Sequence, residues 1–290
     1  MKLFSANLFV IIVMFGVVLT VREGRTVAAA DDEQMAAQVD QSLNAALGKA
    51  DQAAVAKLLD ANFEWTNTEG KTRTKAETLQ ALPALTADTQ GETEIQAHNF
   101  GQVQRFVGKR QNTIFSHLWV KRADGWRAFV FLDTPIPTQG YKNRLSPPTP
   151  EDKECVNPCK VLPFKPANTA QQGAVNAWLA TKMDEWHALA EDWPKHVNEA
   201  SLAISPIMFM NKAERLALLV KQKETYGDGS HSPAVVSMHM YDFGDAVIMT
   251  SIHAPGANGK SARAVRLFVK EDGVWKIALS AQADIQQPAS

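Results

Sequence analysis

Histidine and carboxylate side chains are the groups in this chain best suited to proton transfer. A histidine changes charge near neutral pH, and a carboxylate can orient it or act as the base. His117 and Asp133 fall on neighbouring predicted strands, at positions that alternation places on one face. They could form an acid–base pair, or they could be polar groups satisfied by hydrogen bonds inside an interface. His98 and Glu69 are further candidate proton acceptors, although Glu69 could equally be a solvated turn residue.

A metal centre needs several ligands close together, and the spacing of the seven histidines does not provide them. His239 and His253 flank a predicted turn at 243–245, but their register places them roughly 10–16 Å apart, too far to share an ion. The chain has no zinc-protease, serine-hydrolase or nucleotide-binding loop motif. We therefore predict no metal site and no cofactor.

The two cysteines, Cys155 and Cys159, lie four positions apart. In an exported protein, neighbouring cysteines usually form a disulfide. A redox role is the alternative, but the spacing is not Cys-x-x-Cys, and no histidine follows Cys159 as covalent haem attachment would require. We predict a structural disulfide that closes a small loop.

The N-terminus predicts export. Lys2 precedes an apolar run from Leu8 to Val21, which is shorter than the roughly 20 residues that a membrane-spanning helix needs. The alanine-rich stretch at 27–30 is typical of a signal-peptide cleavage site. We predict a signal peptide at residues 1–30 and a secreted or periplasmic mature chain with no membrane segment. An uncleaved anchor is the alternative, because the residues after the apolar run are unusually charged.

The composition is that of a globular protein. The chain has 290 residues, of which 45% are hydrophobic and 21% are charged, and this length is enough for two domains. Its 30 basic and 31 acidic residues give a net charge of −1, whereas a nucleic-acid-binding protein usually carries a basic excess. We therefore expect no nucleic-acid partner.

Two parts of the chain repeat one another around a proline-rich stretch. Eight of the 14 prolines lie between Pro135 and Pro166, which excludes a helix or a central strand there. On either side, motifs recur in the same order: LWVK and LFVK at an offset of 149, TKAE and NKAE at 137, and FG at 143. We predict two copies of one domain, at 31–135 and 169–290, joined by a linker at 136–168.

Each copy is predicted to be an α+β domain. In copy one, the expected elements are a helix with the apolar stripe Met35, Val39, Leu43 and Leu47, a short helix at 51–59, a strand at 63–67, a helix opened by a capping box of Thr74 and Glu77, and strands that include 112–121 and 126–134. In copy two, the four final strands are expected at 234–242, 246–254, 262–270 and 274–284. This order predicts a curved antiparallel sheet with about three N-terminal helices packed on one face.

The strands of copy one have two different faces. The face expected to meet the helices carries Ile114, Ser116, Leu118, Val120, Trp126, Ala128, Val130 and Leu132. The other face carries Phe115, His117, Trp119, Phe129, Phe131 and Asp133, and is too aromatic to face water. We expect it to pack on the sheet of copy two as an intramolecular pseudo-dimer, near Phe268 and with Asp133 paired to Arg266. The alternative is that it lines a ligand site.

Five segments carry a resemblance to a known superfamily: LLDANFEW at 58–65, TKAETLQAL at 74–82, HLWVKRADGW at 117–126, NKAERLALL at 211–219 and RLFVKEDGVW at 266–275. With the order of elements, they resemble a tandem of nuclear transport factor 2-like domains. This superfamily includes ketosteroid isomerase, the SnoaL-like cyclases and many small proteins of unknown function. The resemblance implies two cone-shaped domains.

The same resemblance places a carboxylate base near the end of the first strand, but this chain has none there. The matching positions read Trp65-Thr-Asn67 in copy one and Ile204-Ser205-Pro206 in copy two. An asparagine side chain can hydrogen-bond but cannot take up a proton at neutral pH. The resemblance therefore places a ligand pocket near Trp65 and Asn67 without carrying over the catalytic residue.

Three functions remain open from the sequence. The favoured hypothesis is an exported protein that binds a small hydrophobic ligand through Trp65, Asn67, Glu69, His98 and His117. The second is an isomerase, cyclase or hydratase acting on a small hydrophobic substrate, with Glu69, His98 or His117 as the base. The third is a noncatalytic pseudo-dimer whose cones are filled by side chains.

Overall fold

The computed structural model describes residues 20–85, 91–137, 145, 147–148, 154–230, 232–256 and 258–285, with residues 20–33 and 83 described by their backbone alone. Most of the predicted signal peptide lies outside these residues, and its last part, 20–30, is the beginning of the first helix. No described helix combines the length and the hydrophobicity that a membrane crossing requires.

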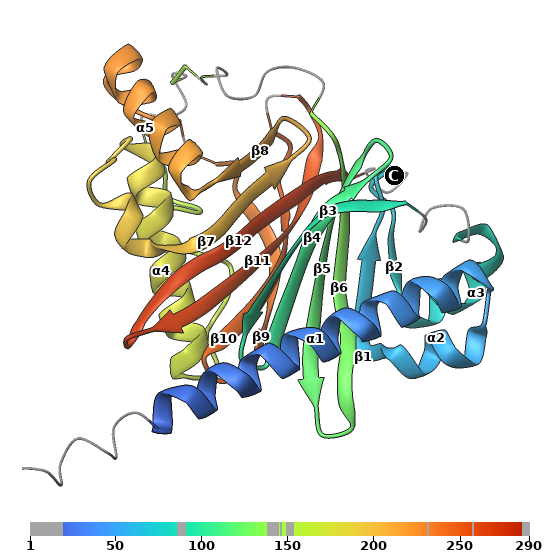
Figure 1. Ribbon diagram of the computed structural model, residues 1–290. Coiled ribbons are helices and arrows are strands. Elements are labelled where there is room, and N and C mark those ends of the chain that lie inside the picture. Colours follow the sequence, from blue (N-terminus) through green and yellow to red (C-terminus); the bar gives the residue numbers. More distant parts are fainter. Residues whose placement is uncertain are drawn as a thin grey trace, which may run out of the picture.

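The first domain is a six-stranded sheet with three helices on one side (Figure 1). Its elements are α1 (Thr20–Gly48), α2 (Gln52–Leu58), β1 (Leu59–Thr66), β2 (Thr72–Thr74), α3 (Lys75–Leu85), β3 (Glu92–Phe100), β4 (Val103–Arg110), β5 (Thr113–Arg122) and β6 (Gly125–Pro135). The strand order is β2-β1-β6-β5-β4-β3. β1 runs parallel to β6, so the sheet is mixed and not purely antiparallel as expected.

The second domain repeats this plan. Its elements are α4 (Thr169–Trp186), the 3₁₀ helix η3 (Trp193–His196), β7 (Val197–Ser205), β8 (Met208–Asn211), α5 (Lys212–Tyr226), β9 (Val235–Asp242), β10 (Ala246–His253), β11 (Ser261–Glu271) and β12 (Val274–Ile285). The strand order β8-β7-β12-β11-β10-β9 matches the first domain, again with one parallel pair, β7 and β12. The predicted tandem of two similar α+β domains is therefore confirmed.

Helices α3 and α5 begin at the predicted capping residues. The Thr74 backbone N–H and hydroxyl both donate to the Glu77 carboxylate at the start of α3, at 2.7 and 2.8 Å. Asn211 and Glu214 form the equivalent capping box of α5. In α1, Leu43 and Leu47 of the predicted stripe are buried, but Met35 is 46% exposed, and Ala36 and Asp40 are buried in the first turns of the stripe.

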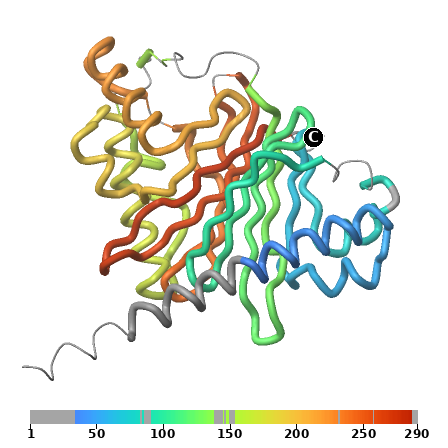
Figure 2. The backbone as a smooth tube through the Cα atoms, in the orientation of Figure 1, coloured from blue at the N-terminus to red at the C-terminus, as the bar shows by residue number. Residues whose placement is uncertain are grey.

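The two sheets pack against each other, with the helices on the two outer sides (Figures 1 and 2). The shared core includes Val103, Ile114, Leu118, Val120, Phe129, Val130 and Leu132 from the first domain and Leu202, Ile204, Ile248, Val265, Leu267 and Leu279 from the second. Arg105 adds hydrogen bonds to the Ala200 and Ala278 carbonyls, at 2.8 and 2.6 Å, and Glu64 pairs with Arg263. The pairing of the domains is present, but through the faces opposite to those predicted.

The aromatic face of copy one points toward its own helices. Phe115, Trp119 and Phe131 pack with α1, α2 and α3 residues in a separate core. Phe129 lies on the sheet–sheet side, because it is the extra residue of β6 where the pairing with β5 shifts between Leu118–Val130 and Trp119–Ala128. Beyond this shift, Trp126 and Ala128 face the helices as predicted. Both faces are buried, so no polar face could indicate which one meets the helices.

The disulfide between Cys155 and Cys159 is present. Both cysteines are buried against Trp186 at the end of α4. Asn157 between them exchanges hydrogen bonds with the backbone of Val235 at the start of β9, at 2.9 and 3.0 Å. This cysteine loop therefore packs on the second domain.

Candidate functional sites in the two domains

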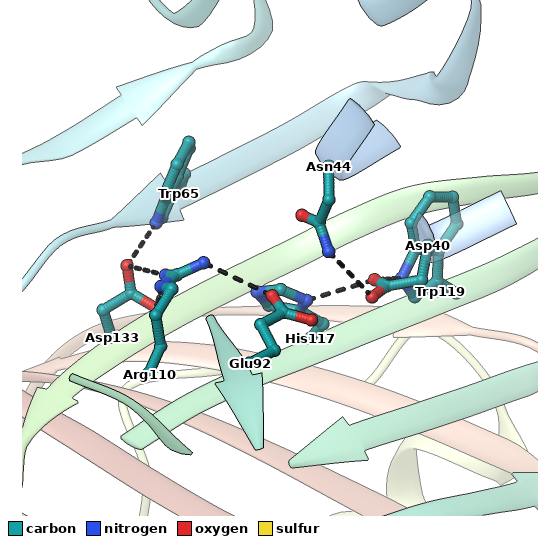
Figure 3. Close-up of polar contacts among 8 residues, drawn as sticks. All are labelled: Asp40, Asn44, Trp65, Glu92, Arg110, His117, Trp119 and Asp133. Carbon is teal, nitrogen blue, oxygen red and sulfur yellow. Dashed lines mark hydrogen bonds and ion pairs between the residues drawn. The ribbon is translucent and has the colours of Figure 1, made fainter. Parts of the chain in front are cut away.

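A chain of buried and half-buried polar side chains crosses the core of the first domain between α1 and the sheet (Figure 3). At one end, Asp40 on α1 accepts hydrogen bonds from Trp119 Nε1 at 2.8 Å and from Asn44 at 3.4 Å. Its Oδ1 also lies 3.1 Å from Nδ1 of His117. Because an ionised carboxylate only accepts, Nδ1 of a neutral His117 must carry the proton and Nε2 the lone pair.

At the other end of this chain, Arg110 on β4 is held by Asp133 on β6 through two contacts of 3.2 Å. Asp133 also accepts a hydrogen bond from Trp65 Nε1 at 2.9 Å. Glu92 at the start of β3 joins the two ends, since its carboxylate lies 3.4 Å from Arg110 and near His117. Burial raises the pKa of Glu92, with the nearby Asp40 carboxylate acting in the same direction.

His117 is held firmly within this cluster. Its ring stacks on Phe131 at 3.7 Å between centroids and an interplanar angle of 12°, and only 1% of the residue is exposed. Nε2 has no hydrogen-bond partner among the described residues. The carboxylates of Asp40, Glu92 and Asp133 share this cluster with one guanidinium, that of Arg110.

The predicted site residues separate into two groups. Trp65 and His117 belong to the polar chain. Asn67, Glu69 and His98 lie outside it. Asn67 closes the β1–β2 turn, where its side chain accepts a hydrogen bond from the Lys71 backbone N–H at 2.9 Å, and Glu69 is exposed in the same turn. His98 is exposed on β3 beside Phe100.

The side-chain partners of Asp133 and His117 in the structure differ from the predicted ones. Asp133 pairs with Arg110, whereas His117 contacts Asp40 and Arg266 lies over the Trp178 ring of its own domain. Sequence reasoning missed Asp40, Asn44, Glu92, Arg110 and Trp119. Asp40 gave no signal, because it lies outside the predicted apolar stripe of Met35, Val39, Leu43 and Leu47.

Arg266 in the second domain stands where His117 stands in the first. The two positions are separated by the repeat offset of 149, and each precedes a buried Leu on the matching strand. The Arg266 guanidinium lies 4.5 Å from the Trp178 ring, and donates to Ser251 Oγ at 3.1 Å. Burial lowers the pKa of Arg266 to about 10.

A pocket of about 250 Å³ opens next to Arg266, between α4, α5 and the sheet of the second domain. Lys182 and Arg215 line it and both contact Glu185, at 2.6 and 3.4 Å. Burial would raise the pKa of Glu185, but these two cations outweigh it and lower the value to about 2. Three basic side chains, those of Lys182, Arg215 and Arg266, therefore surround one carboxylate here.

His253 completes the buried polar group of the second domain. Its Nδ1 contacts the Pro233 carbonyl at 2.9 Å and its Nε2 lies 3.1 Å from Ser251 Oγ. Burial lowers the pKa of His253 to about 3, with Arg266 acting in the same direction. His253 is therefore neutral at physiological pH and adds no charge to this group.

Comparisons with known proteins concern the fold. No protein-family model matches the chain, and no curated protein matches its sequence. Similar solved structures include a nuclear transport factor 2-like protein from Cytophaga hutchinsonii (13% identity, TM-score 0.35, covering 41% of this chain and 99% of that one). Another, from Novosphingobium aromaticivorans, has a cystatin-like fold (12% identity, TM-score 0.32, covering 44% and 94%). The two similar mixed-sheet domains have the architecture expected from the resemblance to this superfamily.

Proposed function

We propose that this protein binds a small molecule with an anionic head and an apolar body in the pocket of the second domain. The observation that carries the proposal is the charge of the pocket wall. Lys182, Lys212, Arg215 and Arg266 line it, and Glu185 is the sole acid among the described lining residues. A carboxylate or phosphate would neutralise part of this buried positive charge and form charge-assisted hydrogen bonds.

The rest of the pocket suits a short apolar body. Leu202, Ile204 and Ile277 line it from the sheet, and Trp193 lines it from η3. Ligand pockets usually have volumes of about 300–1,000 Å³, and a volume near 250 Å³, just below this range, indicates a small ligand.

Hexanoate and benzoate, compared with hexanamide and benzamide, provide a direct test by calorimetry and thermal shift. We expect the acids to bind and the amides to bind at least about tenfold more weakly, because a hydrogen bond to a charged group contributes about 1.5–3 kcal/mol. Arg215→Gln should weaken the binding of the acids about tenfold or more. Lys221→Gln is the matched control, since Lys221 is exposed on the same helix and does not line the pocket. Equal binding of acids and amides, or no binding of either at millimolar concentration, would refute the proposal.

Export of the chain to the periplasm or the cell exterior is part of the same proposal. The apolar run from Leu8 to Val21 and the alanine-rich stretch at 27–30 support it, and disulfides persist in such oxidising compartments. N-terminal sequencing of the protein recovered from its cells should give a mature chain that starts at Asp31. A chain that still starts at Met1 would contradict cleavage.

A further inference from the structure

We propose that Lys182 in the pocket of the second domain forms an imine with a 2-oxo acid, a small carboxylate that carries a carbonyl group beside its acid group. This inference rests on the proposed anion-binding pocket and names the class of its ligand. Lys182 on α4 lines the pocket together with the guanidinium groups of Arg215 and Arg266. The pocket therefore combines groups that suit an anion with a primary amine that can bind a carbonyl covalently.

Lys182 is a buried amine next to the cations of the pocket. Only 9% of the residue is exposed, and its Nζ contacts one oxygen of Glu185 at 2.6 Å. Arg215 contacts the other oxygen of the same carboxylate at 3.4 Å. Nζ and this guanidinium are therefore close neighbours, which suits a ligand whose carbonyl carbon is bonded directly to its carboxylate.

The surroundings of Lys182 favour the nucleophilic form of its amine. Burial lowers the pKa of Lys182, and Arg266 and Arg215 act in the same direction, against the opposing effect of Glu185. A lysine that is buried or lies beside other cations gives up its proton more readily, which is the usual way in which imine-forming lysines are activated.

The reaction conserves charge and releases one water. The Lys182 ammonium gives a proton to Glu185, and the nitrogen lone pair forms a bond to the carbonyl carbon while the carbonyl π electrons move to oxygen. A second nitrogen proton moves to this oxygen, Glu185 returns the first proton, and the oxygen leaves as water. The protonated imine keeps the positive charge of the ammonium, so Glu185 keeps a cationic partner.

Glu185 can relay this proton because its low pKa depends on its partners. Burial raises the pKa of Glu185, and the cations Lys182 and Arg215 lower it to about 2. When Lys182 becomes neutral, one of these two cations is lost while the effect of burial remains. The proton affinity of Glu185 therefore rises as the amine forms.

Reductive trapping tests the proposal on the full chain. The protein is incubated with 2-oxohexanoate and sodium cyanoborohydride, which reduces an imine to a stable amine, and mass spectrometry of its peptides locates the adduct. We expect one adduct per chain, at Lys182, formed at least about tenfold faster than with 2-hexanone, which lacks the carboxylate. Lys182→Arg should abolish this adduct. Lys221→Arg is the matched control, because Lys221 is exposed on α5 and does not line the pocket.

Hexanoate separates this inference from the proposed function. Binding of hexanoate without an adduct at Lys182 would refute the imine and leave the anion-binding pocket in place. Adducts spread over exposed lysines, formed equally fast with 2-hexanone, would refute the imine as well. Absence of both hexanoate binding and the adduct would refute both proposals. Because the adduct is located in the unmutated protein, the test does not depend on the folding of Lys182→Arg.

Discussion

Truncation of Leu118 to alanine tests the sheet–sheet packing. Leu118 is fully buried on β5 in the core shared by the two domains. The substitution removes about three methyl or methylene groups, or about 2.4 kcal/mol at about 0.8 kcal/mol per group. The cavity left between two rigid sheets adds to this cost, so we expect a loss of about 3–4 kcal/mol in the free energy of unfolding.

Urea denaturation followed by tryptophan fluorescence measures this loss. Ile95→Ala is the control, because Ile95 is 50% exposed on β3 and should lose little stability. Trp119→Phe examines the opposite face of the same strand. It should leave the domains associated in small-angle scattering, since Trp119 packs with the helices. A loss below about 1 kcal/mol for Leu118→Ala, or separation of the domains by Trp119→Phe, would refute the assignment of faces.

Three further outcomes follow from the structure. The native pKa of His253 is near 3, below the ordinary value of 6.5, because the ring is buried beside Arg266 and Lys182. Below pH 6.5 the unfolded chain therefore takes up a proton that the folded chain does not. The contribution of neutral His253 to the free energy of unfolding should be fully present above pH 6.5 and should fall by up to about 4 kcal/mol between pH 6.5 and 3. His253→Gln should flatten this dependence in urea titrations at several pH values, and an unchanged slope would contradict the assignment. Reduction of the disulfide, which joins residues four apart, should cost about 2 kcal/mol without unfolding the second domain. Intact mass with and without reductant should differ by two hydrogen atoms, and free thiols in protein isolated without reductant would contradict the bond. Arg105→Gln should destabilise the domain interface by about 1–3 kcal/mol, since the Ala200 and Ala278 carbonyls would lose charged donors, and a stability equal to that of the unchanged protein would contradict this role.

The candidate sites show where prediction from sequence ends. His117 and Trp65 were identified because their residue types stand out on predicted strands. Asp40 and Glu92 were not, since a single acid on a helix and another at a strand end are ordinary surface patterns. Alternation assigned Phe115 and Trp119 to one face, but it could not show that this face meets the helices.

The sequence by itself determined the duplication, the order of helices and strands and the capping boxes. These features depend on local properties: the period of the apolar residues, the proline-rich stretch and the hydrogen bonds that Thr74 and Asn211 make within one turn. The tertiary structure alone decided which sheet faces meet and which charges share a core. Strand pairing and helix packing bring Asp40, Glu92 and His117 together across 77 positions of sequence, and a one-residue bulge turns Phe129 to the other face. Such contacts depend on register between distant segments, because a shift of one residue in a strand exchanges its two faces.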